Sequence, residues 1–75
     1  MNIFRKARKD LNMTRPILAM TIGVPLSTVG RWELGKDFPT PYALEKLSKL
    51  TGIPEETFIK EAGSLPDWKR KRDQP

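Results

Sequence analysis

Two helical periods joined across a single glycine constrain this chain more than any other feature. Between residues 15 and 35, small or apolar residues recur at Ala19, Gly23, Val29 and Trp32. This spacing buries all four between two helices that cross at a steep angle around a tight turn. One face of the second helix then protrudes, with few contacts to the rest of the protein. The pattern therefore predicts a helical corner with one exposed helix face.

The size and composition of the chain limit how it gains stability and what chemistry it can perform. A chain of 75 residues forms one small domain near the lower limit for folding on a hydrophobic core alone. It contains no Cys and no His, so disulfides, the usual zinc ligands and the commonest general base are all missing. No catalytic pair of carboxylates and no nucleophile with its base is suggested either. We therefore expect a protein that is not an enzyme and holds no metal or cofactor.

The hydropathy pattern indicates where in the cell the protein is located. No apolar run approaches the roughly 20 residues that a membrane-spanning helix needs. The N-terminus also lacks the apolar segment of a secretory signal peptide. We expect a soluble cytoplasmic protein.

The net charge of +5 is unevenly distributed. Residues 1–36 carry seven basic and two acidic side chains, whereas residues 37–68 carry three basic and six acidic ones. The last seven residues carry four basic side chains and one acidic. This asymmetry predicts one face that attracts a polyanion and another that faces elsewhere. The alternative is that the charges only keep the protein soluble.

The periodicity predicts an all-α protein with five short helices. Asn12 tolerates the left-handed conformation that commonly ends a helix, and Gly23 permits the tight turn of the corner. Thr14 and Thr40 are plausible N-caps, each followed by a proline that fits the first turn. The helices run from about Asn2 to Leu11, from Thr14 to Gly23, from Leu26 to Glu33, from Thr40 to Gly52, and from Glu55 to Glu61.

The domain is expected to cover residues 1–62. From Gly63 onward, one Gly, one Ser, prolines and a run of charges predict a flexible basic tail over residues 63–75.

Several residues together resemble one family of small helical proteins. They are Arg8, Thr14, Leu18, Ala19, Gly23, Val24, Trp32, Glu33, Gly35, Lys36, Pro39, Gly52 and Ile53. Their order and spacing resemble the Cro/repressor (XRE) helix-turn-helix family over about Ile3 to Ile59. The resemblance implies a compact five-helix domain like that of lambda repressor. It also implies that the helix at 26–33 lies in the major groove of DNA.

The resemblance implies an ion pair between Arg8 and Glu33. This pair would connect the first helix to the end of the third, because a guanidinium can bind a carboxylate through two hydrogen bonds. The alternative is an ordinary surface pair worth less than about 1 kcal/mol.

The resemblance also places groups that bind DNA phosphates at two points. Thr14 and Arg15 stand at the start of the second helix, where Arg15 replaces the glutamine usual in the family. A phosphate there would meet the free N–H groups and positive dipole end of the helix. The loop after the third helix, with Gly35, Lys36 and Phe38, would supply backbone N–H groups and a lysine to the same strand. Lys36 could instead serve only as a cation at a helix C-terminus.

Base contacts are expected from the outward positions of the third helix, which are Leu26, Ser27, Thr28, Gly30 and Arg31. Arg31 is the strongest candidate, because Arg can donate two hydrogen bonds to guanine O6 and N7. It could instead contact a phosphate or remain solvated. Gly30 costs the helix about 1 kcal/mol relative to Ala. Either its missing side chain lets the backbone approach the bases closely, or the position touches nothing.

Two further surfaces are candidates for intermolecular contacts. The basic run Lys69, Arg70, Lys71 and Arg72 could form an arm that enters a minor groove or follows phosphates. A homodimer is expected, because one helix covers only about half a turn of the groove. Apolar residues expected to be left over from the core could form its interface, and they are Leu50, Ile59, Leu65 and Trp68.

Three function classes remain open. The first is a sequence-specific transcription regulator, acting as a repressor on a pseudo-palindromic double-stranded DNA site and associating with the nucleoid when bound. The second is the antitoxin of a toxin–antitoxin pair, which binds DNA and also a toxin protein. The third is a protein-interaction or membrane-surface module built on the basic first helix, but the apolar stripe of that helix is needed for the core. No small-molecule ligand is evident.

Overall fold

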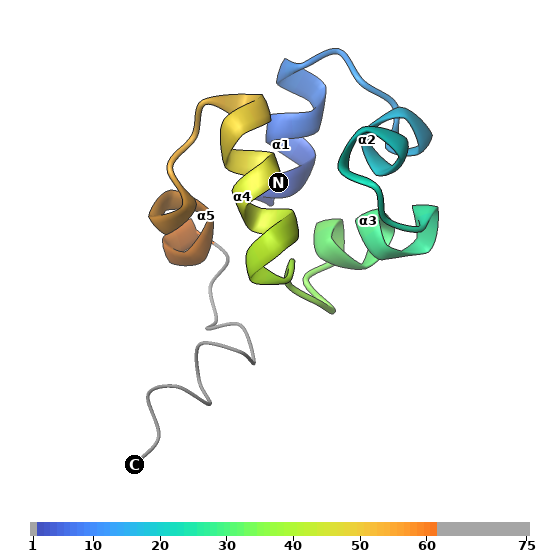
Figure 1. Cartoon of the computed structure of the whole chain (residues 1–75). Coiled ribbons are helices and arrows are strands. Elements are labelled where there is room, and N and C mark those ends of the chain that lie inside the picture. Colours follow the sequence, from blue (N-terminus) through green and yellow to red (C-terminus); the bar gives the residue numbers. More distant parts are fainter. Residues whose placement is uncertain (1, 62–75) are drawn as a thin grey trace.

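The computed structural model describes residues 2–61 of the chain. Over this range it contains five α-helices and no strand, so the predicted all-α class is confirmed. In Figure 1, α4 lies in front, with α2 and α3 to its right and α5 to its left. The helices are α1 (Ile3–Asp10), α2 (Arg15–Ile22), α3 (Leu26–Glu33), α4 (Pro41–Thr51) and α5 (Glu55–Glu61).

Three of the helices begin at side chains that cap them. The side chains of Asn2, Thr14 and Thr40 accept hydrogen bonds from N–H groups in the first turns of α1, α2 and α4. The two threonine caps were predicted from the sequence and are confirmed. Helix α3 differs, because it begins after Pro25 and has no side-chain cap. Its start is therefore fixed by the turn from α2 and by the core beneath it.

The turn between α2 and α3 depends on backbone conformation. Gly23 has a φ of +89°, and its N–H donates to the carbonyl of Ala19 at 2.8 Å. The N–H of Val24 donates to the same carbonyl at 3.0 Å. Asn12, after α1, is likewise left-handed with a φ of +57°. Both residues adopt the conformation that the sequence predicted for them.

Aromatic rings from three helices and one loop meet in the core. The ring of Phe4 in α1 stacks on Phe58 of α5, with ring centroids 5.4 Å apart. It also contacts Trp32 of α3 at 6.1 Å and the edge of Phe38 at 5.6 Å. Val29 and Trp32 are buried, as predicted, so one face of α3 is committed to the interior. The buried apolar residues are Phe4, Ala7, Leu18, Ala19, Ile22, Val29, Trp32, Ala43, Leu44, Leu47, Phe58 and Ile59.

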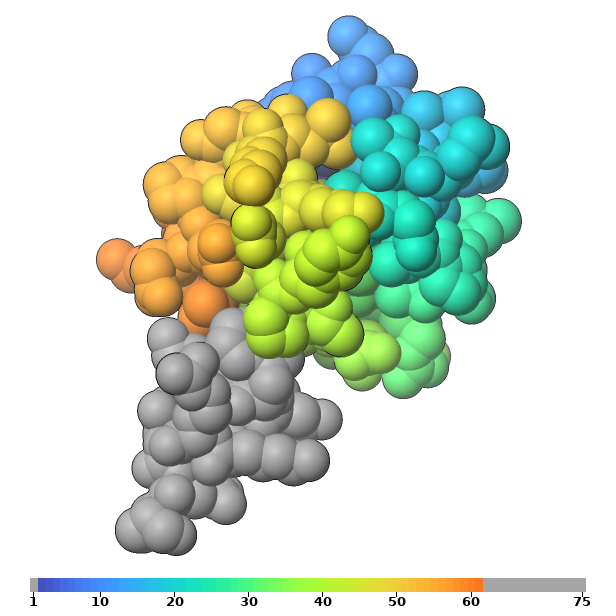
Figure 2. Space-filling model, viewed as in Figure 1, coloured from blue at the N-terminus to red at the C-terminus, as the bar shows by residue number. Residues whose placement is uncertain are grey.

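The position of Ile59 corrects one sequence-based prediction. Its side chain is only 8% exposed and belongs to the core of its own chain. The sequence analysis had taken it as an apolar residue left over for a dimer interface. Because α5 packs against α1 and α4, Ile59 faces inward and is not available to a second subunit. Figure 2 shows the compact surface that α4 and α5 form together.

We predict opposite effects on stability for the same substitution at two glycines. Gly23→Ala lowers the free energy of unfolding by about 1–2 kcal/mol, because Ala is strained in the left-handed conformation. The added Cβ would otherwise meet only the Lys46 amine, at 3.8 Å. Gly30→Ala raises the free energy of unfolding by up to about 1 kcal/mol, because this helical position is open to a Cβ. Urea unfolding measures both, and a Gly23→Ala protein as stable as the wild type would contradict the role of the turn.

Candidate nucleic-acid interface

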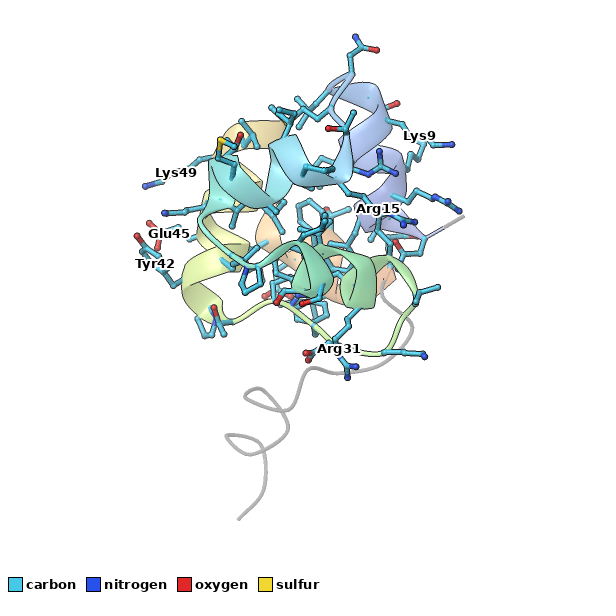
Figure 3. The ribbon with its side chains drawn as sticks, turned by 90° about the vertical axis from the view of Figure 1, so that its right-hand side faces the viewer. Lys9, Arg15, Arg31, Tyr42, Glu45 and Lys49 are labelled. Atoms are coloured by element: carbon cyan, nitrogen blue, oxygen red, sulfur yellow. The ribbon has the colours of Figure 1, made fainter. Side chains whose placement is uncertain are left out.

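The outer face of α3 is exposed and lies beside basic side chains. Leu26 is 52% exposed, and Ser27 and Arg31 are also exposed. Thr28 and Gly30 are half-buried. In Figure 3, α3 lies toward the viewer and Arg31 projects from it at the lower edge of the helical domain, away from the core. The five predicted base-reading positions thus all retain some access to solvent.

The end of α3 carries a buried carboxylate surrounded by arginines, here called the Glu33 cluster: Arg5, Arg8, Arg15 and Glu33. The Glu33 side chain is only 1% exposed. Arg8 donates to it through two nitrogens, from Nε to Oε2 at 2.7 Å and from Nη2 to Oε1 at 3.2 Å. Arg15 Nε donates to Oε1 at 3.2 Å, and Arg5 Nε lies 3.6 Å from the same oxygen. The Arg8–Glu33 ion pair expected from the resemblance is therefore present and partly buried.

The Glu33 cluster is held together by charge. Burial alone would raise the pKa of Glu33, but hydrogen bonds from Arg8 and Arg15, together with their charges, lower it below its ordinary value. The pKa of Arg8 is raised, chiefly by its hydrogen bonds to Glu33. Arg8 also donates from Nη1 to the carbonyl of Met13 at 2.9 Å, which fixes the segment that enters α2. One carboxylate thus connects α1, α2 and α3.

The cluster also carries excess positive charge at the surface. Three guanidiniums share one carboxylate, and the Arg15 and Arg5 side chains are 41% and 45% exposed. Both meet Glu33 through Nε, so the remaining nitrogens of each guanidinium are not engaged by that carboxylate. Figure 3 shows Arg15 above α3, on the same side of the molecule as Arg31. This side of the protein is suited to a polyanion.

The start of α2 offers fewer backbone donors than a typical helix N-terminus. Pro16 has no N–H, and the N–H of Ile17 donates to Thr14 Oγ1 at 3.3 Å. The N–H groups of Thr14 and Arg15 are then the remaining backbone donors at this end of the helix. The hydroxyl oxygen of Thr14 already serves as the cap. An anion at this point would therefore depend mainly on Arg15.

The chain belongs to a known family by comparison with family models. The helix-turn-helix family model matches residues 4–58, which is most of the chain. The protein is a member of the helix-turn-helix family, of the XRE kind. Comparisons with curated proteins and with solved structures each gave no match. Membership makes this a DNA-binding regulatory domain, a class that is not typically catalytic.

In the loop after α3, the structure of this helix-turn-helix domain contradicts the prediction that Phe38 binds a phosphate. The N–H of Phe38 donates to the Asp37 carboxylate at 2.9 Å, and the Phe38 ring packs against Phe4. This N–H is therefore already bound to an anionic group of the chain itself, so Phe38 is not placed to bind a phosphate. Lys36 is exposed and remains a candidate.

Some predicted residues of the helix-turn-helix protein cannot be placed. The basic run Lys69, Arg70, Lys71 and Arg72 lies outside the described residues, as do Leu65 and Trp68. Leu50 is described and half-buried, at the end of α4. Over residues 2–61, none of the helices is long and apolar enough to cross a membrane.

Sequence reasoning missed three contacts that position α3. Arg15 was expected only at a phosphate, and its hydrogen bond to Glu33 was not predicted. Arg5 was not assigned to the cluster, although its place three residues before Arg8 puts both on one face of α1. Asn2 was recognised only as the start of α1. Its Nδ2 also donates to the carbonyl of Trp32 at 2.6 Å, which ties the N-terminus to the last turn of α3. No sequence signal marked this last contact.

We predict that the stabilising effect of Glu33 depends on pH. Because its folded pKa is lowered, the contribution is complete above the ordinary value of 4.5 and is lost as the pH falls through the folded pKa. At pH 7, Glu33→Gln lowers the free energy of unfolding by about 3 kcal/mol, since buried guanidinium charge loses its partner. Below pH 4.5 the difference in free energy of unfolding between Glu33→Gln and the wild type becomes smaller.

Urea unfolding between pH 7 and pH 3 measures this difference. The matched control is Glu45→Gln, which removes an exposed carboxylate paired with Lys49 at 3.0 Å. We expect this control to change stability by less than about 1 kcal/mol. A Glu33→Gln deficit that stays constant down to pH 3 would contradict the assigned role of the charge.

Proposed function

We propose that this chain is a sequence-specific transcription regulator, acting as a repressor, that reads double-stranded DNA with α3 in the major groove. The observation that carries this proposal is the two-sided character of α3. Its inner face is fixed by buried Val29 and Trp32, while Leu26, Ser27 and Arg31 on its outer face are exposed. A helix held rigidly on one side and bare on the other fits a groove without rearranging the core.

The outer face of α3 supports specific base contacts of several kinds. Arg31 can donate two hydrogen bonds to guanine O6 and N7. Ser27 and Thr28 can donate or accept at base edges, and Leu26 offers an apolar contact for a thymine methyl group. At Gly30, an added Cβ would meet no atom of the protein within 4 Å. Packing within the protein therefore does not require this glycine, which is compatible with a close approach of the backbone to DNA.

Phosphate contacts would come from basic side chains that flank α3. Arg15 stands at the start of α2 with its Nε held by Glu33, and Thr14 caps the same helix. Lys36 follows the end of α3 on the other side. Phosphates bound at these two places would fix the register of α3 on the duplex. The sequence-independent part of the affinity would then fall steeply with salt.

The proposed assembly is a homodimer. One recognition helix reads only about half a turn of DNA, whereas two related by a two-fold axis read half-sites about 34 Å apart. Such a dimer requires a pseudo-palindromic site. Of the residues that the sequence predicted for its interface, Leu50 is the one that remains among those described, because Ile59 is in the core.

Selection of bound duplexes from a random pool tests the proposed function. We expect enrichment of a pseudo-palindromic site with half-sites one helical turn apart and a guanine in each. Arg31→Ala should then reduce the preference for that guanine about tenfold, the value of one bidentate contact. Lys49→Ala, on the exposed side of α4, is the control and should keep the preference (Figure 3). A pool with no enriched sequence after selection would refute specific reading.

A further inference from the structure

A carboxylate lies beside Arg31, the main candidate for base reading. Arg31 Nε is 3.6 Å from Asp37 Oδ2, and each of the two side chains is 53% exposed. The other oxygen of the same carboxylate, Oδ1, accepts the N–H of Phe38 at 2.9 Å. Asp37 is thus held by the backbone on one side and contacts Arg31 on the other.

The path of the chain after α3 brings Asp37 to this place. Gly35 is left-handed, with a φ of +73°. The N–H of Lys36 donates to the carbonyl of Arg31 at 3.0 Å, and the N–H of Gly35 donates to that of Trp32 at 3.2 Å. This pair of bonds is a Schellman motif, which reverses the chain at the end of the helix. The loop therefore returns alongside the last turn of α3, next to Arg31.

The loop is also anchored in the core, one residue beyond Asp37. The Phe38 ring meets the edge of Phe4 with centroids 5.6 Å apart, and Pro39 is buried. Asp37 therefore projects from a segment that is fixed on both sides, by the Schellman motif and by Phe38. Its carboxylate has a defined position relative to α3, whereas a carboxylate on an unanchored loop would not.

The chemistry of a guanidinium gives this contact a consequence for DNA reading. A carboxylate at Nε leaves the two terminal nitrogens, Nη1 and Nη2, for a second planar partner such as guanine O6 and N7. In water an exposed pair of this kind is weak. Bound DNA excludes water from the contact, which strengthens the interaction between the two charges. The same negative charge repels a phosphate that approaches Arg31.

We propose that Asp37 is a specificity-determining residue of the DNA interface. It orients Arg31 so that the terminal nitrogens face a guanine, and it disfavours complexes in which Arg31 turns to a phosphate. Asp37 acts through Arg31 and is therefore a positioning residue. The inference rests on the proposed function, reading of DNA by α3, and names the residue that sharpens its base preference.

Asp37→Asn tests the proposal with little change in shape. The Asn Oδ1 can still accept the N–H of Phe38, so the loop anchor is kept while the charge is lost. Asp37→Ser, whose hydroxyl can accept the same bond, is a second variant. The matched charge control is Glu45→Gln, which also removes one negative charge from an exposed ion pair, on α4 and away from Arg31 (Figure 3). Thermal melting verifies that each variant is folded.

The measurement is the dissociation constant at one fixed salt concentration for three duplexes. These are the selected site, the same site with the Arg31-dependent guanine replaced, and a duplex of unrelated sequence. We expect Asp37→Asn to bind the unrelated duplex more tightly than Glu45→Gln does. We also expect Asp37→Asn to lower the preference for the guanine about fivefold, which is less than the loss of a whole bidentate contact would cause. In an Arg31→Ala background, Asp37→Asn should leave the base preference unchanged.

Three results would overturn the inference. First, Asp37→Asn could show the same preference for the guanine as the wild type. Second, Glu45→Gln could lower this preference as much as Asp37→Asn does. Third, Asp37→Asn could lower it in the Arg31→Ala background as much as in the wild-type background. Each of these leaves the proposed function intact, provided that the wild-type protein discriminates between the duplexes. A wild-type protein that binds all three duplexes alike refutes the proposed function and the inference together.

Discussion

The buried carboxylate of Glu33 is the constraint on which the rest of the structure depends. It lies in the last turn of α3, where the helix dipole disfavours negative charge, and it is almost wholly removed from water. Such a group is tolerated only with charged partners, and Arg8 and Arg15 provide them from α1 and α2. One residue of α3 therefore joins the two helices of the corner to α1. Trp32, beside Glu33, adds the apolar part of the same attachment.

Local signals explain why most of the fold could be predicted from the sequence. Thr14 and Thr40 are N-caps that act within three residues, and Gly23 satisfies a backbone requirement that few other residues meet. The inward face of α3 follows from helical periodicity, which places Val29 and Trp32 on one stripe. The link between Arg8 and Glu33 came from the family resemblance, because no local rule joins residues 25 positions apart.

The remaining contacts depend on how the helices are rotated and where the loops run. Ile59 is buried because α5 packs against α1 and α4, which its own short helix does not encode locally. The contact between Asp37 and Arg31 needs both the Schellman turn and the anchoring of Phe38, so it follows from two features combined. The bond from Asn2 to the carbonyl of Trp32 likewise joins distant segments. The sequence predicted the exposed face of α3 and, through the resemblance, the Arg8–Glu33 pair, but it did not predict the contacts that Asp37 and Asn2 make with this helix.

The central claim is that the outer face of α3 is the surface that contacts DNA. This face is exposed because the side chains of the opposite face fix the helix in the core. Titration of isotopically labelled protein with the selected duplex, followed by backbone amide NMR shifts, tests this claim most directly. The account predicts the largest shifts over residues 26–31 and at Arg15, with small shifts at Glu45 and Lys49 on α4. Largest shifts on α4 or α5, with residues 26–31 unmoved, would contradict it.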